Sequence, residues 1–329
     1  MMIATVGEAL VDLIEQPDGR FEACLGGSVC NFTQALSMQG VPTTYLNPLS
    51  HDKFGQRFNA LLLKKGVSLG AGRRSSCPTS LAVVSLDAQG SPTYAFHRES
   101  VADRDITADL LVASLPAPCT LLHTGGLALV PADLGKILAT IQAATSRDAL
   151  ISIDANLRPM AVAQDAGYVD GVKRALQQAH IVKVSDEDLE LLGLGHATPE
   201  QLAAALFEES KVQLIALTHG AAGATLLTRT QQVSMAPPEH LKVIDTVGAG
   251  DCFHAGLIAF LQHAGKLANA HCLEQLEQAS LQAALQHAIA AASINITRTG
   301  CDPASWEQTI AFRKTQFKAG NGNGHARAR

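Results

Sequence analysis

The sequence predicts an α/β fold with a mostly parallel central sheet flanked by helices, and a small β-sheet inserted near the N-terminus. Strand-like and helix-like runs alternate along residues 119–220 at the spacing of βαβ units. Two hairpin patterns interrupt the first hundred residues. The chain has 329 residues, of which 47% are apolar and 17% charged, and this composition is typical of a globular protein.

The N-terminal segment predicts a hairpin that leaves the main sheet and a helix that follows it. Strands are expected at residues 2–7, 8–16 and 20–25, with the PDG turn at residues 17–19 between the last two. Apolar residues then recur at helical spacing from Ser28 until Gly40 stops the helix.

A second hairpin is expected after the next strand and helix. That strand is predicted at residues 43–50, and the helix at residues 53–65 is closed by Gly66. Two β-rich runs then flank the AQGSP turn between Ser80 and Glu99. We expect the hairpins, at about residues 10–25 and 80–100, to join as one small sheet.

The rest of the chain predicts the main α/β layer. Strands are expected at residues 119–125, 149–156, 180–185 and 213–220, and helices at residues 132–146, 167–179 and 186–192. Two further strand-like runs occupy residues 221–247, and the chain is mostly helical from Gly250 to residue 298. One domain is therefore expected over residues 1–317, followed by a disordered tail at residues 318–329.

Charge and hydropathy exclude several classes of function. The net charge is -5 and no stripe of Lys and Arg occurs, so nucleic acid is not an expected partner. No uncharged apolar run reaches about 18 residues, so no membrane span is expected. The N-terminus lacks the basic and apolar regions of a signal peptide, which indicates a cytoplasmic protein.

The run DTVGAGDCFHAGL, residues 245–257, carries the strongest chemical signal. Gly248 and Gly250 lack Cβ atoms, so the amides of Gly248, Ala249 and Gly250 can converge on an anion at the start of a helix. Asp251, in the first helical turn, could accept a proton from an alcohol at the same place. The alternative is a tight turn followed by an ordinary first-turn carboxylate. No GxxxxGK[ST] loop occurs in the chain.

The string D-T-V-G-A-G-D-C-F resembles the signature of the ribokinase, or PfkB, family of carbohydrate kinases. A glycine pair, Gly26 and Gly27, precedes Asn31 near the N-terminus, as it does in that family. The resemblance covers residues 2–317. It implies a ribokinase-like fold whose inserted hairpins form a lid over the sugar site.

The resemblance also implies roles for single residues in the sugar site. Asp251 would be the catalytic base, and the amides of residues 248–250 would form the anion hole. Asp12 would bind sugar hydroxyls, and Gly27 with Asn31 would complete the pocket. The residues alone favour a solvent-facing strand residue for Asp12, and they allow a helix-surface amide for Asn31.

For the nucleotide, the resemblance implies ATP with Mg²⁺. Thr218 and Gly220 in LTHG match a turn that contacts the ATP phosphates, and the carboxyl end of a parallel strand is where ligands collect. The small residues Ala288, Ala291 and Ala292 would wall the adenine. They could instead be helix-packing alanines.

Cation binding is implied by the family alone. Asp245 matches an aspartate near a monovalent cation, usually potassium. Where relatives carry N-x-x-E and organise magnesium indirectly, this chain has Ser185 and Asp188 at that spacing, and another register would place Glu187 there.

The substrate expected from the resemblance is a ketose. Four runs, GEALVDLI, YAFHR followed by ADR, DANLRP and KVSDEDLELL, are similar to those of fructokinases, which implies phosphorylation of D-fructose at the 6-hydroxyl. Arg98 could reach the pocket or lie on the lid surface, and Asn156 and Arg158 could face substrate or phosphate. In DANLRP, Ala155 replaces a proline that is common in relatives.

Other functions stay open at this stage. A 2-keto-3-deoxygluconate kinase or another PfkB-type sugar kinase is the first alternative, and a sugar-sensing pseudokinase without catalysis is another. A nicotinamide dehydrogenase is set aside, because no G-x-G-x-x-G follows the first strand. The family resemblance also implies a homodimer formed through the lid.

Overall fold

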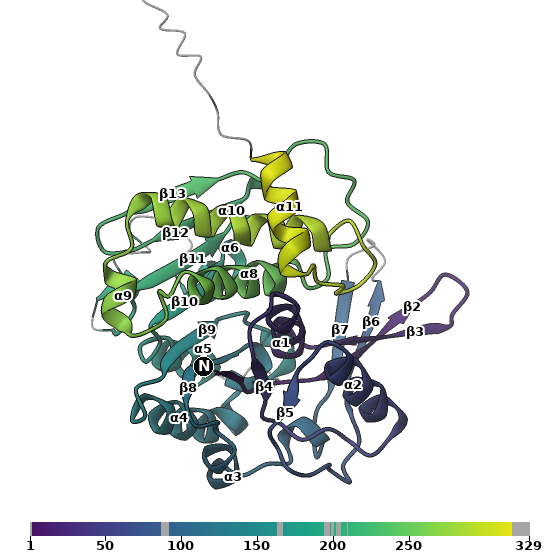
Figure 1. The fold of residues 1–329 in the computed structure, drawn as a ribbon. Helices are drawn as coiled ribbons and strands as arrows, with labels where there is room; N and C mark the ends of the chain where they lie inside the picture. The colour runs from purple at the N-terminus through teal and green to yellow at the C-terminus, as the bar shows by residue number, and fades with distance from the viewer. Residues whose placement is uncertain are drawn as a thin grey trace, which may run out of the picture.

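The computed structural model describes residues 2–86, 92–162, 167–193 and 210–317, together with residues 198, 201 and 205–208. Within these residues a large sheet forms the centre of the molecule and a smaller sheet stands beside it (Figure 1). In spatial order the large sheet contains β13 (Gln232–Met235), β12 (Ala224–Leu227), β11 (Leu214–Thr218), β10 (Ile181–Ser185), β9 (Leu150–Asp154), β8 (Cys119–Gly125), β1 (Met2–Thr5), β4 (Thr43–Tyr45) and β5 (Ser68–Leu69).

The large sheet is parallel from β5 to β11, and β12 and β13 extend it antiparallel at one edge. This arrangement confirms the predicted α/β fold. The parallel strands are near-continuous apolar runs because helices cover both faces of such a sheet. Their carboxyl ends lie along one edge, where β9, β10 and β11 end at Asp154, Ser185 and Thr218.

Helices pack on both faces of the large sheet. They are α1 (Ser28–Met38), α2 (Lys53–Lys64), α3 (Ala108–Ala113), α4 (Pro131–Thr145), α5 (Gly167–Leu176), α6 (Asp186–Leu191), α8 (Ala249–His263), α9 (Ala270–Glu274), α10 (Gln278–Asn295) and α11 (Trp306–Gln316). Side chains of α1, α8 and α10 share one apolar core with the sheet, and side chains of α4 and α5 share another. The sheet therefore separates two cores.

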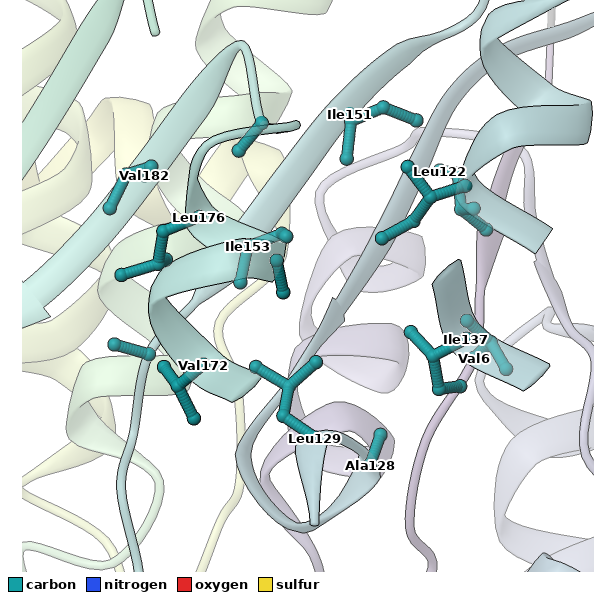
Figure 2. Packing of buried hydrophobic residues seen from close by; sticks show 14 of the residues in the cluster. Val6, Leu122, Ala128, Leu129, Ile137, Ile151, Ile153, Val172, Leu176 and Val182 are labelled. Atoms are coloured by element: carbon teal, nitrogen blue, oxygen red, sulfur yellow. The ribbon is translucent and has the colours of Figure 1, made fainter. Parts of the chain in front are cut away.

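Figure 2 shows part of the core under α4 and α5. Leu122 on β8, Ile151 on β9 and Val182 on β10 are buried together with Ile137 of α4 and Val172 of α5. Each of these five side chains is 1% exposed or less, so contact with the helices removes almost all of its apolar surface from water. The core fixes the positions of β9 and β10, and these strands lead to the site.

The small sheet has the order β3 (Phe21–Gly26), β2 (Leu10–Glu15), β6 (Ser80–Leu86) and β7 (Pro92–His97). Its two hairpins are joined by the parallel pairing of β2 with β6, as the sequence predicted. Figure 1 shows the β2–β3 hairpin projecting away from the large sheet. The predicted AQGSP turn lies mostly at residues outside the described part.

Three expectations differ from the structure or fall outside it. The strand expected at residues 43–50 covers only Thr43–Tyr45, because Asn47 turns to accept a hydrogen bond from the Gly7 amide and Pro48 has no N–H for a ladder. The short helix α3 and the C-terminal helix α11 were not anticipated. The tail expected at residues 318–329 lies outside the described residues.

Candidate active site

The loop before α8 has the geometry of an anion site. Gly248 is the N-cap of α8 with φ +73°, a left-handed conformation that favours glycine. A Cβ atom on Gly248 would also lie 2.6 Å from the Cys301 Sγ. The first amides of a helix have no acceptor within the helix and carry its positive end, so the amides of Gly248 and Gly250 can bind an anion here. The Ala249 amide donates to the Thr246 carbonyl at 3.2 Å, and the anion contact predicted for it stays a prediction.

Asp251 lies in the first turn of α8 and is held by two donors from α1. The Ser28 Oγ donates to Asp251 Oδ1 at 2.7 Å, and the Asn31 Nδ2 donates to Oδ2 at 3.0 Å. Burial raises the pKa of the Asp251 carboxyl, and the Ser28 and Asn31 hydrogen bonds oppose that rise. An ionised carboxylate in this position can take a proton from an alcohol.

Glu8 holds the N-terminus of α1 from the link between β1 and β2. Its Oε1 accepts the Ser28 amide at 3.0 Å, and its backbone carbonyl accepts the Cys30 amide at 3.2 Å. Burial raises the pKa of Glu8 to about 6. Glu8 Oε2 is buried without a hydrogen-bond partner among the described residues. Glu8 thereby positions the helix whose side chains hold Asp251.

The glycine pair lets the chain between β3 and α1 pass close to β2 and to the link between β1 and β2. A Cβ atom on Gly26 would lie 2.5 Å from Asp12 Oδ2, and one on Gly27, whose φ is +96°, would lie 2.7 Å from the Glu8 carbonyl oxygen. Asp12 is partly buried on β2, and burial raises its pKa to about 6 against the opposing effect of Arg158. Neither Asp12 nor the buried Asn31 is a solvent-facing residue. Their sugar-binding roles stay predictions.

Arg98 is not on the lid surface. Its Nη2 lies 3.0 Å from Asp103 Oδ2, its Nη1 donates to the Leu127 carbonyl at 3.0 Å, and the residue is buried. These contacts anchor the end of β7 to the body of the protein. The guanidinium therefore has a structural role, and the sugar contact predicted for it stays a prediction.

The DANLRP loop brings Asn156 and Arg158 near the same region. Asn156 has φ +37°, an uncommon conformation for a residue with a side chain, and its Nδ2 lies close to Gly126. Arg158 is exposed, and its charge lowers the pKa of both Asp12 and Asp251. The loop therefore faces both carboxylates.

The predicted nucleotide residues divide into two groups. Thr218 ends β11, and Gly220 follows with φ +53° and open space around it. Ala288 is completely buried, and a Cβ on Gly256 of α8 would lie 3.2 Å from its Cα and 2.9 Å from the Ala291 Cβ. For Ala288 and Ala291 this geometry favours the packing interpretation over an adenine contact, whereas Ala292 is only partly buried.

The two carboxylates predicted near cations already accept protein hydrogen bonds. Asp245 accepts from the Val247 amide at 2.9 Å and the Gly300 amide at 2.8 Å, one on each oxygen. Asp188 forms a capping box with Ser185, accepts the Leu157 amide at 2.8 Å and is buried. Asp188 thus ties α6 to the DANLRP loop. Glu187, from the alternative register, is exposed. Both cation roles stay predictions.

Three site residues were not predicted from the sequence: Glu8, Ser28 and Lys183. Ser28 lies one helical turn before Asn31, a spacing that places both on one face of α1. Lys183 interrupts the apolar strand IVKVS, and a charge within a buried strand is a signal in itself. Its ammonium pairs with Asp154 at 3.0 Å.

Transfer of a phosphoryl group to an alcohol requires an anion site and a proton acceptor beside it, and the N-terminus of α8 with the Asp251 carboxylate is typical of that class of enzyme, the phosphotransferases. The chain belongs to the pfkB family of carbohydrate kinases, because the family model matches residues 1–308. It is therefore a sugar kinase. No helix within the described residues has the length and apolar character needed to cross a membrane. The cytoplasmic location stays a prediction.

Similar proteins agree with this assignment. A fructokinase from Rhizobium leguminosarum bv. trifolii is 34% identical over 266 residues, which cover 79% of this chain and 80% of the relative. The crystal structure of a Xylella fastidiosa fructokinase with bound ATP has a TM-score of 0.85 at 24% identity and covers 96% of this chain and 99% of that one. A Vibrio cholerae O395 fructokinase double mutant, with fructose, ADP and potassium bound, has a TM-score of 0.79 at 25% identity, covering 94% and 97%.

Proposed function

We propose that the protein transfers the γ-phosphoryl group of ATP to the 6-hydroxyl of D-fructose, with Asp251 as the base. The observation that carries the proposal is the Asp251 carboxylate, which Ser28 and Asn31 hold at the N-terminus of α8 beside the Gly248–Gly250 amides. A proton acceptor and an anion site thus lie within one helical turn. This is what transfer of a phosphoryl group to an alcohol requires.

In the proposed reaction the sugar hydroxyl gives its proton to Asp251 while its oxygen bonds to the γ-phosphorus, and the bond from that phosphorus to the oxygen of the leaving ADP breaks. Asp12, Gly27 and Asn31 hold the sugar. The amides of residues 248–250 stabilise the charge on the transferring group, because fixed donors need no reorganisation during the reaction. Mg²⁺ bound with ATP neutralises phosphate charge.

The nucleotide and the monovalent cation are assigned to the carboxyl end of the sheet. Thr218 and Gly220 contact the ATP phosphates at the end of β11, and the partly buried Ala292 lies against the adenine. Asp245 is the group proposed for potassium. Each of its oxygens accepts one N–H in the structure and keeps lone-pair capacity for a cation.

Fructose is the substrate we favour over an acidic sugar. The Rhizobium relative at 34% identity is a fructokinase, and the Vibrio structure contains fructose with ADP. Three carboxylates, Glu8, Asp12 and Asp251, lie on this side of the site. A negatively charged substrate would have to approach them with Arg158 as the exposed opposing cation, since Arg98 and Lys183 are buried. A 2-keto-3-deoxygluconate kinase is the second candidate. The exposed guanidinium of Arg158 favours it, because a guanidinium can bind the carboxylate of such a substrate.

A coupled assay with ATP, Mg²⁺ and a panel of ketoses and 2-keto-3-deoxy sugar acids tests the proposal. We expect D-fructose to give the highest kcat/KM, and mass spectrometry and NMR of the product to locate the phosphate on O6. A preference for the sugar acid would make the sugar acid the assigned substrate in place of fructose. No turnover of any sugar would favour the sugar-sensing pseudokinase instead of a kinase. Asp251→Asn should lose roughly 10²- to 10⁴-fold in kcat while still binding fructose.

A homodimer through the small sheet is a further part of the proposal. The strand registers place Tyr94, Val84, Ile14 and Asp12 on one face of this sheet. Tyr94 at its outer end is 44% exposed, and a sheet face with exposed apolar side chains is a surface that another molecule can cover.

A further inference from the structure

The face of the large sheet beneath α8 changes from apolar to polar toward the active site. Leu121, Leu150 and Ile181 begin this face on β8, β9 and β10 and belong to the apolar core with α8. Two residues further along each strand the same face carries buried polar groups, which are His123, Ser152 and Lys183, with Asp154 at the end of β9. Buried polar groups are costly, so their concentration under the GAGD loop requires an explanation.

Lys183 and Asp154 are the charged pair of this band. They are register partners on adjacent parallel strands, their Nζ to Oδ1 distance is 3.0 Å, and their side chains are 7% and 2% exposed. An ammonium group has three donors. Among the described residues Asp154 is the hydrogen-bond partner that the structure shows for the Lys183 ammonium.

The ammonium lies directly against the GAGD loop. A Cβ atom on Gly250 would be 3.2 Å from Lys183 Nζ and 3.4 Å from Cε, so the absence of a side chain at Gly250 lets the charge approach the loop. Gly250 is followed by Asp251. The buried cation therefore lies beneath the segment that carries both the proposed base and the proposed anion-hole amides.

Three buried carboxylates share this cation. Burial alone would lower the pKa of Lys183, but the negative charges of Asp154, Asp188 and Asp251 outweigh that effect and keep the ammonium protonated. Burial raises the pKa of Asp154 to about 7, and Lys183 opposes the rise. Asp188 and Asp251 are also buried. The ammonium is thus the charge that balances the acidic side chains under the loop.

We propose that Lys183 is a positioning residue of the phosphoryl-transfer site, whose ammonium beneath Gly250 supplies the positive charge that keeps Asp251 a proton acceptor. The inference rests on the proposed function, since it gives Asp251 the role of base. Loss of the ammonium would leave Asp251 buried with less opposing charge, and its pKa would rise. The base would then be protonated over a wider range of pH.

Five other titratable groups interact with Asp251 from the elements around it. The Arg158 charge lowers the pKa of Asp251, and the Asp251 charge raises the pKa of Glu8, Cys30, Asp154 and Cys301. Arg158 is the other cation among them, and it is exposed, so solvent weakens its effect. The remaining groups are acidic or neutral. Lys183 is therefore the buried cation that opposes the rise in the pKa of Asp251, beside the hydrogen bonds from Ser28 and Asn31.

The test compares three variants. Lys183→Met removes the ammonium, Asp154→Asn removes its partner but keeps the ammonium, and Lys183→Met with Asp154→Asn removes both charges and avoids an unpaired carboxylate in the core. The acid limb of the pH profile of kcat/KM is measured for each, with the melting temperature. Infrared difference titration against Asp251→Asn follows protonation of the Asp251 carboxyl without turnover.

We expect the acid-limb pKa to rise by about one unit or more in Lys183→Met, which is a tenfold or larger loss of kcat/KM on the acid side that recovers at higher pH. The double variant should show a smaller rise, because loss of the Asp154 charge offsets part of the loss of the ammonium. In Asp154→Asn the acid-limb pKa should stay the same or fall. A merely structural pair would lower activity equally in both single variants at every pH, and that result would overturn the inference. If Lys183→Met does not fold, the double variant is compared with Asp154→Asn, since these two differ only in the Lys183 ammonium.

The proposed function and this inference can fail separately. Wild-type protein that phosphorylates no sugar refutes the function, and the infrared titration then still reports whether Lys183 sets the protonation of Asp251. Wild-type protein that phosphorylates fructose, with an unchanged Asp251 titration in Lys183→Met, refutes the inference alone.

Discussion

The Ser28 hydroxyl donates a 2.7 Å hydrogen bond to Asp251 Oδ1 across 223 positions of the sequence. Ser28 is the first residue of α1 and Asp251 lies in the first turn of α8, so the bond joins two helix N-termini. The two helices pack together through Phe32 and Ala35 of α1 and the apolar side chains of α8. Helix packing therefore determines how the proposed base is oriented.

Ser28→Ala should raise the pKa of Asp251, because a hydrogen bond to the ionised carboxylate is lost while burial remains. The sign follows from the direction of the shift: a raised pKa moves the acid limb of kcat/KM to higher pH. We expect a rise of roughly one unit, with activity largely recovered above the new pKa. A pH profile of kcat/KM measures it.

Ser37→Ala is the matched control for Ser28→Ala. Ser37 lies on the same helix, and its hydroxyl donates to the Lys65 carbonyl at 2.8 Å, away from Asp251. Its acid limb should coincide with that of the wild type. If Ser37→Ala moves the limb as far as Ser28→Ala does, the effect comes from α1 as a whole and the hydrogen bond to Asp251 is not its cause.

Asp12→Asn should weaken sugar binding and stabilise the fold at neutral pH. Burial raises the folded-state pKa of Asp12 to about 6 from its ordinary value of 3.8, so the folded state binds the proton more tightly than the unfolded state. The wild type therefore loses stability as pH rises from about 4 to 6. The amide has no such loss. We expect its advantage at pH 7 to be roughly 1 to 2 kcal/mol, allowing for partial exposure.

Urea unfolding at pH 4.5 and pH 7, together with the KM for fructose, checks the Asp12→Asn prediction. The gain in stability should be larger at pH 7 than at pH 4.5, and KM should rise roughly tenfold or more. Asp109→Asn, an exposed aspartate in the first turn of α3, should show neither change. If Asp12→Asn is no more stable than the wild type at pH 7, ionisation of the partly buried Asp12 does not destabilise the folded protein, and the prediction is wrong.

The fold could be predicted from local patterns, and the site only in part. Strand and helix periodicity predicts the α/β layer and both hairpins because the strands are long apolar or alternating runs. Helix α11 was missed, since Thr309 is its buried residue and Trp306 packs against His263 and His287 instead of following an apolar stripe.

The missing site residues depend on contacts that no local pattern contains. Asp251 and Asn31 stand in recognisable motifs. The role of Lys183 depends on the register that pairs it with Asp154, 29 positions away, and on the packing of the GAGD loop against it. Glu8 acts through the Ser28 amide, and this contact exists only once α1 has packed beside the link from β1 to β2.

Tyr94→Ser combined with Val84→Ser should convert the proposed dimer to a monomer. Both side chains lie on the face of the small sheet that carries Asp12, and Tyr94 stacks near Phe96. Sedimentation velocity measures the change. Leu63→Ser on α2 is the control, because Leu63 is 54% exposed but lies outside the small sheet. A wild type that sediments as a monomer at micromolar concentration contradicts the dimer.

Gly248→Ala should reduce kcat by about a hundredfold or more with little change in the KM for fructose. The alanine would keep φ near +73° only with strain, and its Cβ would press on the Cys301 Sγ, so the amides of the loop would shift from their positions. Gly265→Ala separates strain from function. Gly265 has nearly the same φ, +69°, with open space around it and no part in the site, so this variant should lose a similar part of its stability to backbone strain, about 1 kcal/mol, and keep full activity. Steady-state kinetics and melting temperatures of both variants decide the matter: equal losses of activity in the two would mean that strain in the fold, and not the geometry of the anion hole, accounts for the effect.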